Sequence, residues 1–110
     1  MKRVFILSRH SVFSLGIETL LSQETGIEIV SQGTNPRASL ECIQRYSPDV
    51  VIINCDDPEP ELTSVVLDIL RDRLGICVIS LSLRNNQMSI YRGEKKQICQ
   101  VEDLLEAIRE

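Results

Sequence analysis

The sequence predicts an α/β fold in which a doubly wound, mostly parallel sheet has helices on both faces. Short apolar segments alternate with longer ones whose apolar residues recur every three or four positions, as strands alternate with amphipathic helices. The short segment 49–54 is apolar at consecutive positions, as a central strand covered on both faces requires. The intervening segments are long enough for the crossovers that join parallel strands. With 110 residues, the chain 1–110 is expected to form a single domain.

The first half of the chain is expected to form two strands and two helices. The strands are the compact apolar runs 3–7 and 27–30. Residues 11–23 between them have apolar residues at helical spacing, which predicts a helix with one buried face. Pro36 suits the first turn of a second helix, where its missing N–H costs nothing, and Pro48 ends that helix.

The second half continues the alternation and then departs from it. After the central strand 49–54, a helix is expected over 62–74 and a fourth strand over 76–81. Residues 83–87 have turn composition and 88–92 resemble a strand, so we expect an antiparallel hairpin at the sheet edge in place of a fourth helix.

The C-terminal part is expected to complete this atypical region and to add one helix. The atypical hairpin region is taken as 83–98, and residues 97–99 are expected to extend the strand or add another. The closing helix is 101–109, with Glu102 and Asp103 in its first turn and Arg109 in its last, as the helix dipole favours.

Composition and charge exclude several classes of function. Hydrophobic residues make up 43% of the chain and charged residues 25%, as in ordinary soluble globular domains. The net charge of -4 argues against whole-surface attraction to nucleic acid or anionic membrane. Without Trp, and with two Tyr and two Phe, a base-stacking platform is not expected. The apolar runs are short and the N-terminus lacks a signal-peptide layout, so we expect a cytoplasmic protein with no membrane partner.

No metal site, cofactor or enzymatic activity is predicted. The four cysteines are widely spaced, form no CxxC pair and are accompanied by one histidine, His10. We expect reduced, mostly buried thiols, with Cys55 reaching solvent because it follows a strand. There is no Walker motif and no GxGxxG, and His10 is expected to help cap the first helix rather than to catalyse a reaction.

Three segments resemble the receiver domain of bacterial two-component response regulators, in particular regulators with a LuxR-type or NarL-type DNA-binding domain. In 3–16, Ser8, Arg9 and His10 stand where the family has two acids and a histidine after its first strand. In 47–54, Pro48 begins a Pro-Asp-Val-Val run like the one that precedes the family's phosphorylated aspartate. Residues 102–109 are similar to the family's last helix. The resemblance covers residues 2–82 and the closing helix, and it implies a flavodoxin-like or CheY-like arrangement.

The residues that depart from the family pattern predict a pseudo-receiver. At the positions of the family's acidic pair and phosphoacceptor stand Ser8, Arg9 and Asn54. Mg²⁺ prefers carboxylate or phosphate oxygens, so these residues are not expected to bind it. The amide of Asn54 is delocalised and cannot act as the acyl-phosphate nucleophile. Ser80 matches the hydroxyl that senses phosphorylation in the family, although a serine that ends a buried strand also has structural roles. Ser8, Arg9, Asn54 and Ser80 therefore form a predicted degenerate phosphoacceptor pocket without catalytic residues.

An acidic run follows this pocket and has two interpretations. Asp56 or Asp57 could substitute for the missing carboxylates, or the run, which also includes Glu59 and Glu61, could be a solvated loop before a helix. We favour the solvated loop. Arg9 is expected to pair with Asp56 or Asp57 and to hold the pocket in one state.

The atypical hairpin predicts an interaction surface. About fifteen residues separate Ser80 from Lys95, too few for a helix, a strand and their connections. The flank of the sheet is then uncovered, unless the hairpin folds over and buries itself. An exposed apolar flank would bind a protein partner or a second copy of the chain. Basic residues on the hairpin could instead protect an exposed edge from aggregation. The residues of the predicted surface are Arg84, Met88, Ile90, Tyr91, Arg92, Lys95 and Lys96.

The sequence thus predicts a non-phosphorylatable receiver-like signalling module in transcriptional regulation, which switches by partner binding or homodimer formation. The expected partners are a protein, a second copy, or a DNA-binding regulator. One alternative is a small-anion or nucleotide sensor that uses the loop 8–11 with Asn54 and Ser80. Another is an accessory module that contacts DNA through the basic hairpin.

Overall fold

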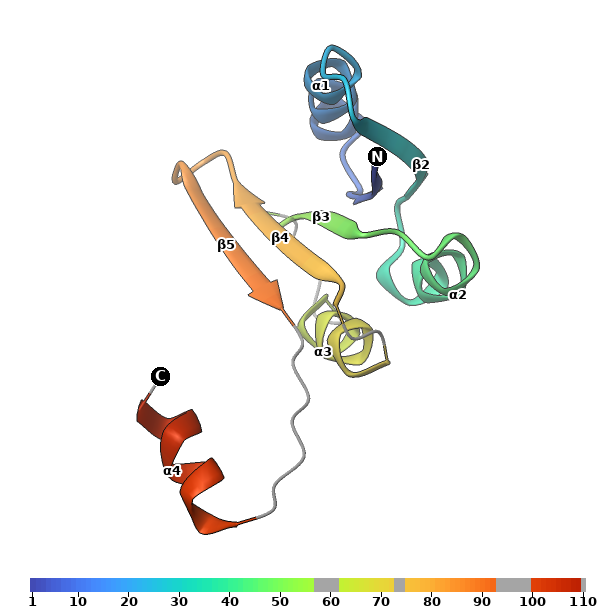
Figure 1. Cartoon of the computed structure of the whole chain (residues 1–110). Helices are drawn as coiled ribbons and strands as arrows, with labels where there is room; N and C mark the ends of the chain where they lie inside the picture. The colour runs from blue at the N-terminus through green and yellow to red at the C-terminus, as the bar shows by residue number, and fades with distance from the viewer. Residues whose placement is uncertain (57–61, 73–74, 93–99, 110) are drawn as a thin grey trace.

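The computed structural model contains one five-stranded sheet in the order β2-β1-β3-β4-β5, with helices on both faces (Figure 1). It describes residues 1–56, 62–72, 75–92 and 100–109. In chain order the elements are β1 (Lys2–Leu7), α1 (Ser11–Ser22), β2 (Ile27–Gly33), α2 (Pro36–Tyr46), β3 (Val50–Asn54), α3 (Leu62–Asp72), β4 (Cys77–Ser82), β5 (Gln87–Arg92) and α4 (Val101–Arg109). This is the predicted α/β architecture with an antiparallel edge.

Strands β1 to β4 are parallel, and β5 returns antiparallel to β4, as the turn composition predicted. The hairpin pairs Leu81 with Met88 and Ile79 with Ile90. Its turn places Asn86 at φ 53°, in the left-handed region that asparagine tolerates better than most residues. The hairpin therefore stands where a further crossover helix would otherwise continue the parallel sheet.

Two apolar cores lie on opposite faces of the sheet because successive strand residues alternate between faces. On one face α2 and α3 cover Phe5, Val51 and their neighbours, all nearly inaccessible to solvent. On the other face α1 packs Phe13 and Ile17 against Ile6 and the adjacent strands. This arrangement holds β1 and β3 at the centre of the sheet, with their carboxyl ends side by side.

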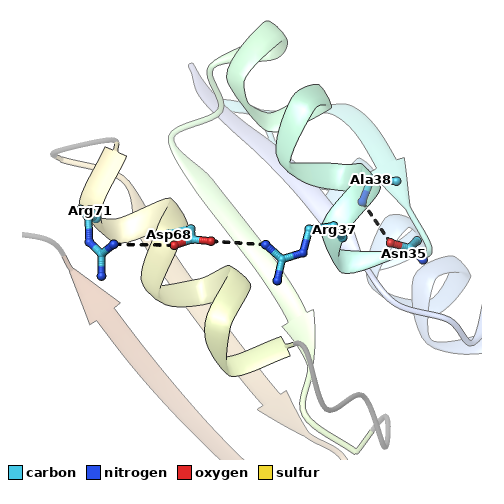
Figure 2. A network of polar contacts seen from close by, with 5 residues as sticks. All are labelled: Asn35, Arg37, Ala38, Asp68 and Arg71. Atoms are coloured by element: carbon cyan, nitrogen blue, oxygen red, sulfur yellow. Dashed lines mark hydrogen bonds and ion pairs between the residues drawn. The ribbon is translucent and has the colours of Figure 1, made fainter.

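Local signals set the ends of α2 and its relation to α3. The side chain of Asn35 caps α2 by accepting a hydrogen bond from the Ala38 N–H at 3.0 Å (Figure 2). Arg37 on α2 lies 3.6 Å from Asp68 on α3, which also lies 4.0 Å from Arg71 (Figure 2). The Arg37–Asp68 pair joins α2 to α3, whereas the Arg71–Asp68 pair lies within α3; both are surface pairs that contribute little stability.

One prediction about α1 is corrected. His10 occupies the N-cap position of α1, but its side chain makes no capping hydrogen bond. The residue has extended backbone geometry, so its carbonyl still accepts the first turn's hydrogen bond, from the N–H of Ser14 at 3.2 Å. Its contribution to this helix end therefore comes from the backbone and not from the imidazole.

The C-terminal elements are exposed. All six residues of β5 are exposed, and no residue of α4 is buried. In Figure 1, α4 lies apart from the sheet, and β5 forms its open edge. Among the helices of the described part of the chain, none has the length and hydropathy needed to cross a bilayer.

Candidate functional site

Two of the predicted pocket residues meet at the carboxyl ends of the central strands. Ser8 follows β1 and Asn54 ends β3, and because these strands are parallel neighbours their ends lie together. Both side chains are almost fully buried, at 2% and 5% exposure. The Nδ2 of Asn54 donates a hydrogen bond to the Ser8 Oγ at 3.3 Å. The structure therefore brings these two side chains into contact.

The amide of Asn54 connects two loops. Its Oδ1 accepts a hydrogen bond from the backbone N–H of Asp56 at 3.0 Å, while its Nδ2 binds Ser8. The Ser8 Oγ also accepts the N–H of His10 at 3.0 Å. Both ends of the amide are engaged within the protein, so Asn54 joins the loop after β1 to the loop after β3.

The space beside Asn54 is small. Ser8, Arg9 and Asn54 line a cavity of ≈ 10 Å³, about the volume that one water molecule requires. A wider cavity of ≈ 560 Å³ opens on the other side of Ser8 and Arg9, between α1 and the end of β2. Ser11 and Thr34 contribute hydroxyls to its lining, and Glu18 contributes a carboxylate. Hydroxyl groups and charged groups of both signs therefore line the wider cavity.

Ser80 does not join the other pocket residues. It is 8% exposed, but it lines neither cavity beside Ser8. The register pairs Ser80 with Ile53, whereas Asn54 pairs with Leu81, so Ser80 and Asn54 point to opposite faces of the sheet. The four residues therefore do not all share one pocket. Strand β4 places Leu81, the residue after Ser80, on the face of the sheet where Asn54 lies.

Asp56 closes the turn of the β4–β5 hairpin. Its Oδ1 accepts a hydrogen bond from the Ser82 Oγ at 2.7 Å, and its Oδ2 accepts the N–H groups of Leu83 at 3.0 Å and Arg84 at 3.1 Å. The hydroxyl of Ser82, and then the N–H of Arg84, lower the pKa of the Asp56 carboxyl below its ordinary value of 3.8. The carboxylate is therefore a structural acceptor within the fold.

These contacts decide between the interpretations of the acidic run where the structure describes it. Of the two expected partners of Arg9, Asp56 instead contacts Ser82 and the hairpin backbone. Asp57, Glu59 and Glu61 lie outside the described residues. The carboxylate of Asp56 accepts its hydrogen bonds from the hairpin turn, so it does not replace the missing acids of the pocket.

Sequence reasoning missed Ser82. This residue is 3% exposed, donates to Asp56 and accepts the N–H of Asn85 at 3.1 Å. The available signal was the alternation Ser80-Leu81-Ser82, which places two hydroxyls on one face of a strand that ends at a turn. A hydroxyl at that position either meets a polar partner or leaves a buried group unsatisfied.

The described residues contain no group of three His, Cys, Asp or Glu side chains that could hold a metal ion. Cys42, Cys55 and Cys77 are free thiols, and Cys55 is exposed as predicted. Cys42 and Cys77 are partly rather than fully buried, and Cys99 lies outside the described residues.

The predicted interaction surface is divided between two faces of the sheet. Met88 and Ile90 are 60% and 50% exposed and lie on the α1 face, since their partners are Leu81 and Ile79. Tyr91 is 45% exposed but lies on the opposite face, beside Val78. Arg84 is exposed in the turn before β5 and Arg92 is exposed at the end of β5, whereas Lys95 and Lys96 lie outside the described residues.

Asp56→Asn should destabilise the hairpin turn and reduce the dependence of the free energy of unfolding on acidic pH. Because the folded-state pKa of Asp56 is lowered, its charge stabilises the fold above the unfolded pKa, and this stabilisation is lost as pH falls through the folded pKa. Hydrogen exchange should show faster exchange of the Leu83 and Arg84 amides in the variant. Denaturation at several acidic pH values should show a shallower pH slope than in the wild type. Asp68→Asn, on the surface of α3, is the matched control; equal slopes in the wild type and Asp56→Asn would contradict the assignment.

The comparisons with known proteins point in one direction. No protein-family model matches the chain. It is 22% identical over 85 residues to the transcriptional regulatory protein DegU of Brevibacillus brevis, covering 77% of this chain and 36% of that protein. The chain thus spans about a third of the length of this curated relative.

Solved structures with the same fold are also response regulators. The signal receiver domain of the putative response regulator NarL from Mycobacterium tuberculosis superposes with a TM-score of 0.65 at 25% identity, covering 74% of this chain and 65% of that one. The isolated REC domain of RcsB from Salmonella enterica gives 0.67 at 20% identity, covering 77% and 64%. RcsB has also been solved bound to promoter DNA. The chain thus has the fold of the receiver domains of these two response regulators.

Proposed function

We propose that this chain is a receiver-like domain that does not undergo phosphoryl transfer and that signals through protein contacts in transcriptional regulation. The observation that carries the proposal is Asn54, which ends the central strand β3 where the receiver family has its phosphoacceptor carboxylate. Its amide is engaged at both ends, with Ser8 and with the backbone of Asp56. A residue with this chemistry and these contacts is a structural connector and not a nucleophile.

The surroundings of Asn54 support the same conclusion. Ser8 and Arg9 contribute a hydroxyl and a guanidinium, so the pocket has no carboxylate from the positions that bind Mg²⁺ in the family. The carboxylate of Asp56 is held by Ser82 and by the hairpin turn. A fixed cation such as Arg9 also opposes the binding of a divalent metal at close range. Mg²⁺-dependent phosphorylation is therefore not expected.

The relatives and the exposed hairpin support a role in transcriptional signalling. DegU is described as a transcriptional regulatory protein, and RcsB binds promoter DNA. We infer that this chain works with a DNA-binding regulator, as part of the same protein or as its partner. The exposed apolar residues Met88 and Ile90 are the contact face in this proposal. Signalling would then depend on which partner occupies that face.

The wild-type chain should show neither a mass increase with acetyl phosphate and Mg²⁺ nor a thermal shift with beryllium fluoride and Mg²⁺. The reason is the missing carboxylates at the positions of Ser8, Arg9 and Asn54. Intact-mass spectrometry and differential scanning fluorimetry provide the two measurements. Asn54→Asp alone tests whether the acceptor was the only missing element. The triple variant Ser8→Asp/Arg9→Asp/Asn54→Asp tests whether the acidic set restores a response. A phosphoryl adduct on the wild type would refute the proposal.

A small-anion sensor is the second candidate, favoured by the wider cavity beside α1. This cavity of ≈ 560 Å³ combines the guanidinium of Arg9 with the hydroxyls of Ser11 and Thr34. A ligand that binds only the folded state raises stability with the logarithm of its saturation. Titration with inorganic phosphate and with ATP should then raise the melting temperature of the wild type but not of Arg9→Gln. Absence of a shift with both compounds would remove this candidate.

A further inference from the structure

The sheet presents an uncovered apolar surface on the face that α1 covers only in part. The register places Ile79, Leu81, Met88 and Ile90 on this face. Helix α1 covers its β2-β1-β3 side, and in the described residues no helix covers the β4–β5 side (Figure 1). A cavity of ≈ 400 Å³, lined by Phe13, Ile17 and Leu83 among others, borders this surface next to α1. We call the four residues Ile79, Leu81, Met88 and Ile90 the sheet patch.

Helix α4 carries a matching apolar surface. Its apolar residues recur at positions i, i+3, i+4 and i+7, which places them on one side of the helix. No residue of α4 is buried. An amphipathic helix of this kind normally obtains its stability by packing its apolar side against another element. We call these residues the α4 stripe; they are Val101, Leu104, Leu105 and Ile108, and they are 40% to 69% exposed.

The whole chain exposes more surface than a compact protein of its mass. Its accessible surface is 7598 Å², whereas a compact monomer of 12.5 kDa exposes about 6,200 Å². Its Cα radius of gyration is 15.4 Å, against about 13 Å for a compact domain of this length. The excess is larger than the roughly 800 Å² that each partner buries in an ordinary stable interface. The chain therefore has enough surplus surface for such an interface.

The two surfaces also have opposite charge. The only charged residues from 77 to 92 are Arg84, in the turn between β4 and β5, and Arg92, at the end of β5. The α4 helix has three acids, Glu102, Asp103 and Glu106, against the single base Arg109. The net charges of α4 and of the β4–β5 hairpin are therefore opposite in sign, which favours their encounter.

We propose that the occupant of the sheet patch is the α4 helix of a second copy of this chain, exchanged reciprocally in a two-fold dimer. Each chain carries both the patch and the helix, so one two-fold pairing covers both patches and both stripes and closes the assembly. In this arrangement α4 supplies the missing helical cover of the β4–β5 side of the sheet. The inference rests on the proposed function in one respect only: it identifies the partner of the same hairpin face.

Sedimentation equilibrium of the full chain over a concentration series tests the dimer. The wild type should be dimeric, and Ile90→Glu and Leu104→Glu/Ile108→Glu should each raise the dimer dissociation constant about tenfold or more. Leu67→Glu, an exposed leucine on α3 at 54% exposure, is the matched control and should leave the constant unchanged. Circular dichroism of each variant shows whether its fold is retained. A wild type that stays monomeric throughout, or a dimer insensitive to the α4 substitutions, would overturn the proposal.

Mixing the two defective variants tests the exchange itself. The Ile90→Glu chain keeps its α4 stripe and the Leu104→Glu/Ile108→Glu chain keeps its patch, so the mixture restores one of the two contacts. A heterodimer should therefore form that is tighter than either variant alone and weaker than the wild type. If α4 docks on its own sheet, the mixture stays monomeric. If two patches pair directly, the Leu104→Glu/Ile108→Glu chain dimerises by itself, because its patch is intact. Either result refutes the exchange. Neither result depends on phosphorylation. The exchange can therefore be refuted while the proposed absence of phosphoryl transfer holds, and the reverse is also possible.

Discussion

Phe5→Ala should lower the free energy of unfolding by about 3–5 kcal/mol. Phe5 is fully buried in β1, at the centre of the sheet. It packs in the core beneath α2 and α3, together with Ile43 and Val51. Removing its ring would leave a cavity that neighbouring strands, fixed by their hydrogen bonds, cannot close. Since a domain of this kind has about 5–15 kcal/mol of stability, the loss is a large fraction of the total.

Chemical denaturation followed by circular dichroism measures this effect. Phe5→Leu should cost much less because most of the buried volume is kept. Leu67→Ala, at the exposed leucine of α3, should change stability by about 0.5 kcal/mol or less. A Phe5→Ala loss as small as that of the Leu67 control would contradict the position of Phe5 in the core.

Asn54→Leu should lower the free energy of unfolding by about 1–3 kcal/mol, although leucine is apolar and similar in size. The substitution removes the acceptor of the Asp56 N–H and the donor to the Ser8 Oγ. Ser8 keeps its bond with the N–H of His10, but the part-buried N–H of Asp56 loses its acceptor. The cost arises from unsatisfied polar groups and not from lost packing.

A double-mutant cycle separates these contributions. Ser8→Ala and Asn54→Leu should be non-additive because they remove the same hydrogen bond. Gln44→Leu, an exposed amide on α2, is the control for replacing an amide by leucine and should change stability little. Full additivity of the Ser8 and Asn54 substitutions would show that the bond between them contributes nothing to folding.

The order and type of the secondary-structure elements could be predicted from the sequence because the local signals agree with the tertiary structure. The consecutive apolar residues 50–53 require a strand covered on both faces, and the structure places them in β3 between the two cores. Pro36 begins α2 as predicted. The turn asparagines indicated the hairpin, and Asn86 adopts the left-handed backbone that makes the turn.

The site was only partly predictable. The meeting of Ser8 and Asn54 follows from parallel strand ends, a rule that depends on topology alone. The bond from Ser82 to Asp56 joins residues 26 positions apart, and no local pattern records which hydroxyl reaches which carboxylate. Ser80 failed for a related reason, since a register one residue different would have placed it on the Asn54 face. The amphipathic pattern of α4 specifies an apolar side but not its occupant.

The polar contacts from Ser8 through Asn54 and Asp56 to Ser82 form one continuous path from the loop after β1 to the hairpin. We expect this path to couple the pocket to the sheet edge. A ligand that rearranges Asn54 must change the free energy of the turn held by Asp56, and with it the affinity of whatever covers β5. Reciprocity requires that occupation of β5 changes the pocket's affinity for that ligand by the same factor. This coupling would not require an acyl phosphate, because these hydrogen bonds join residues of the chain itself.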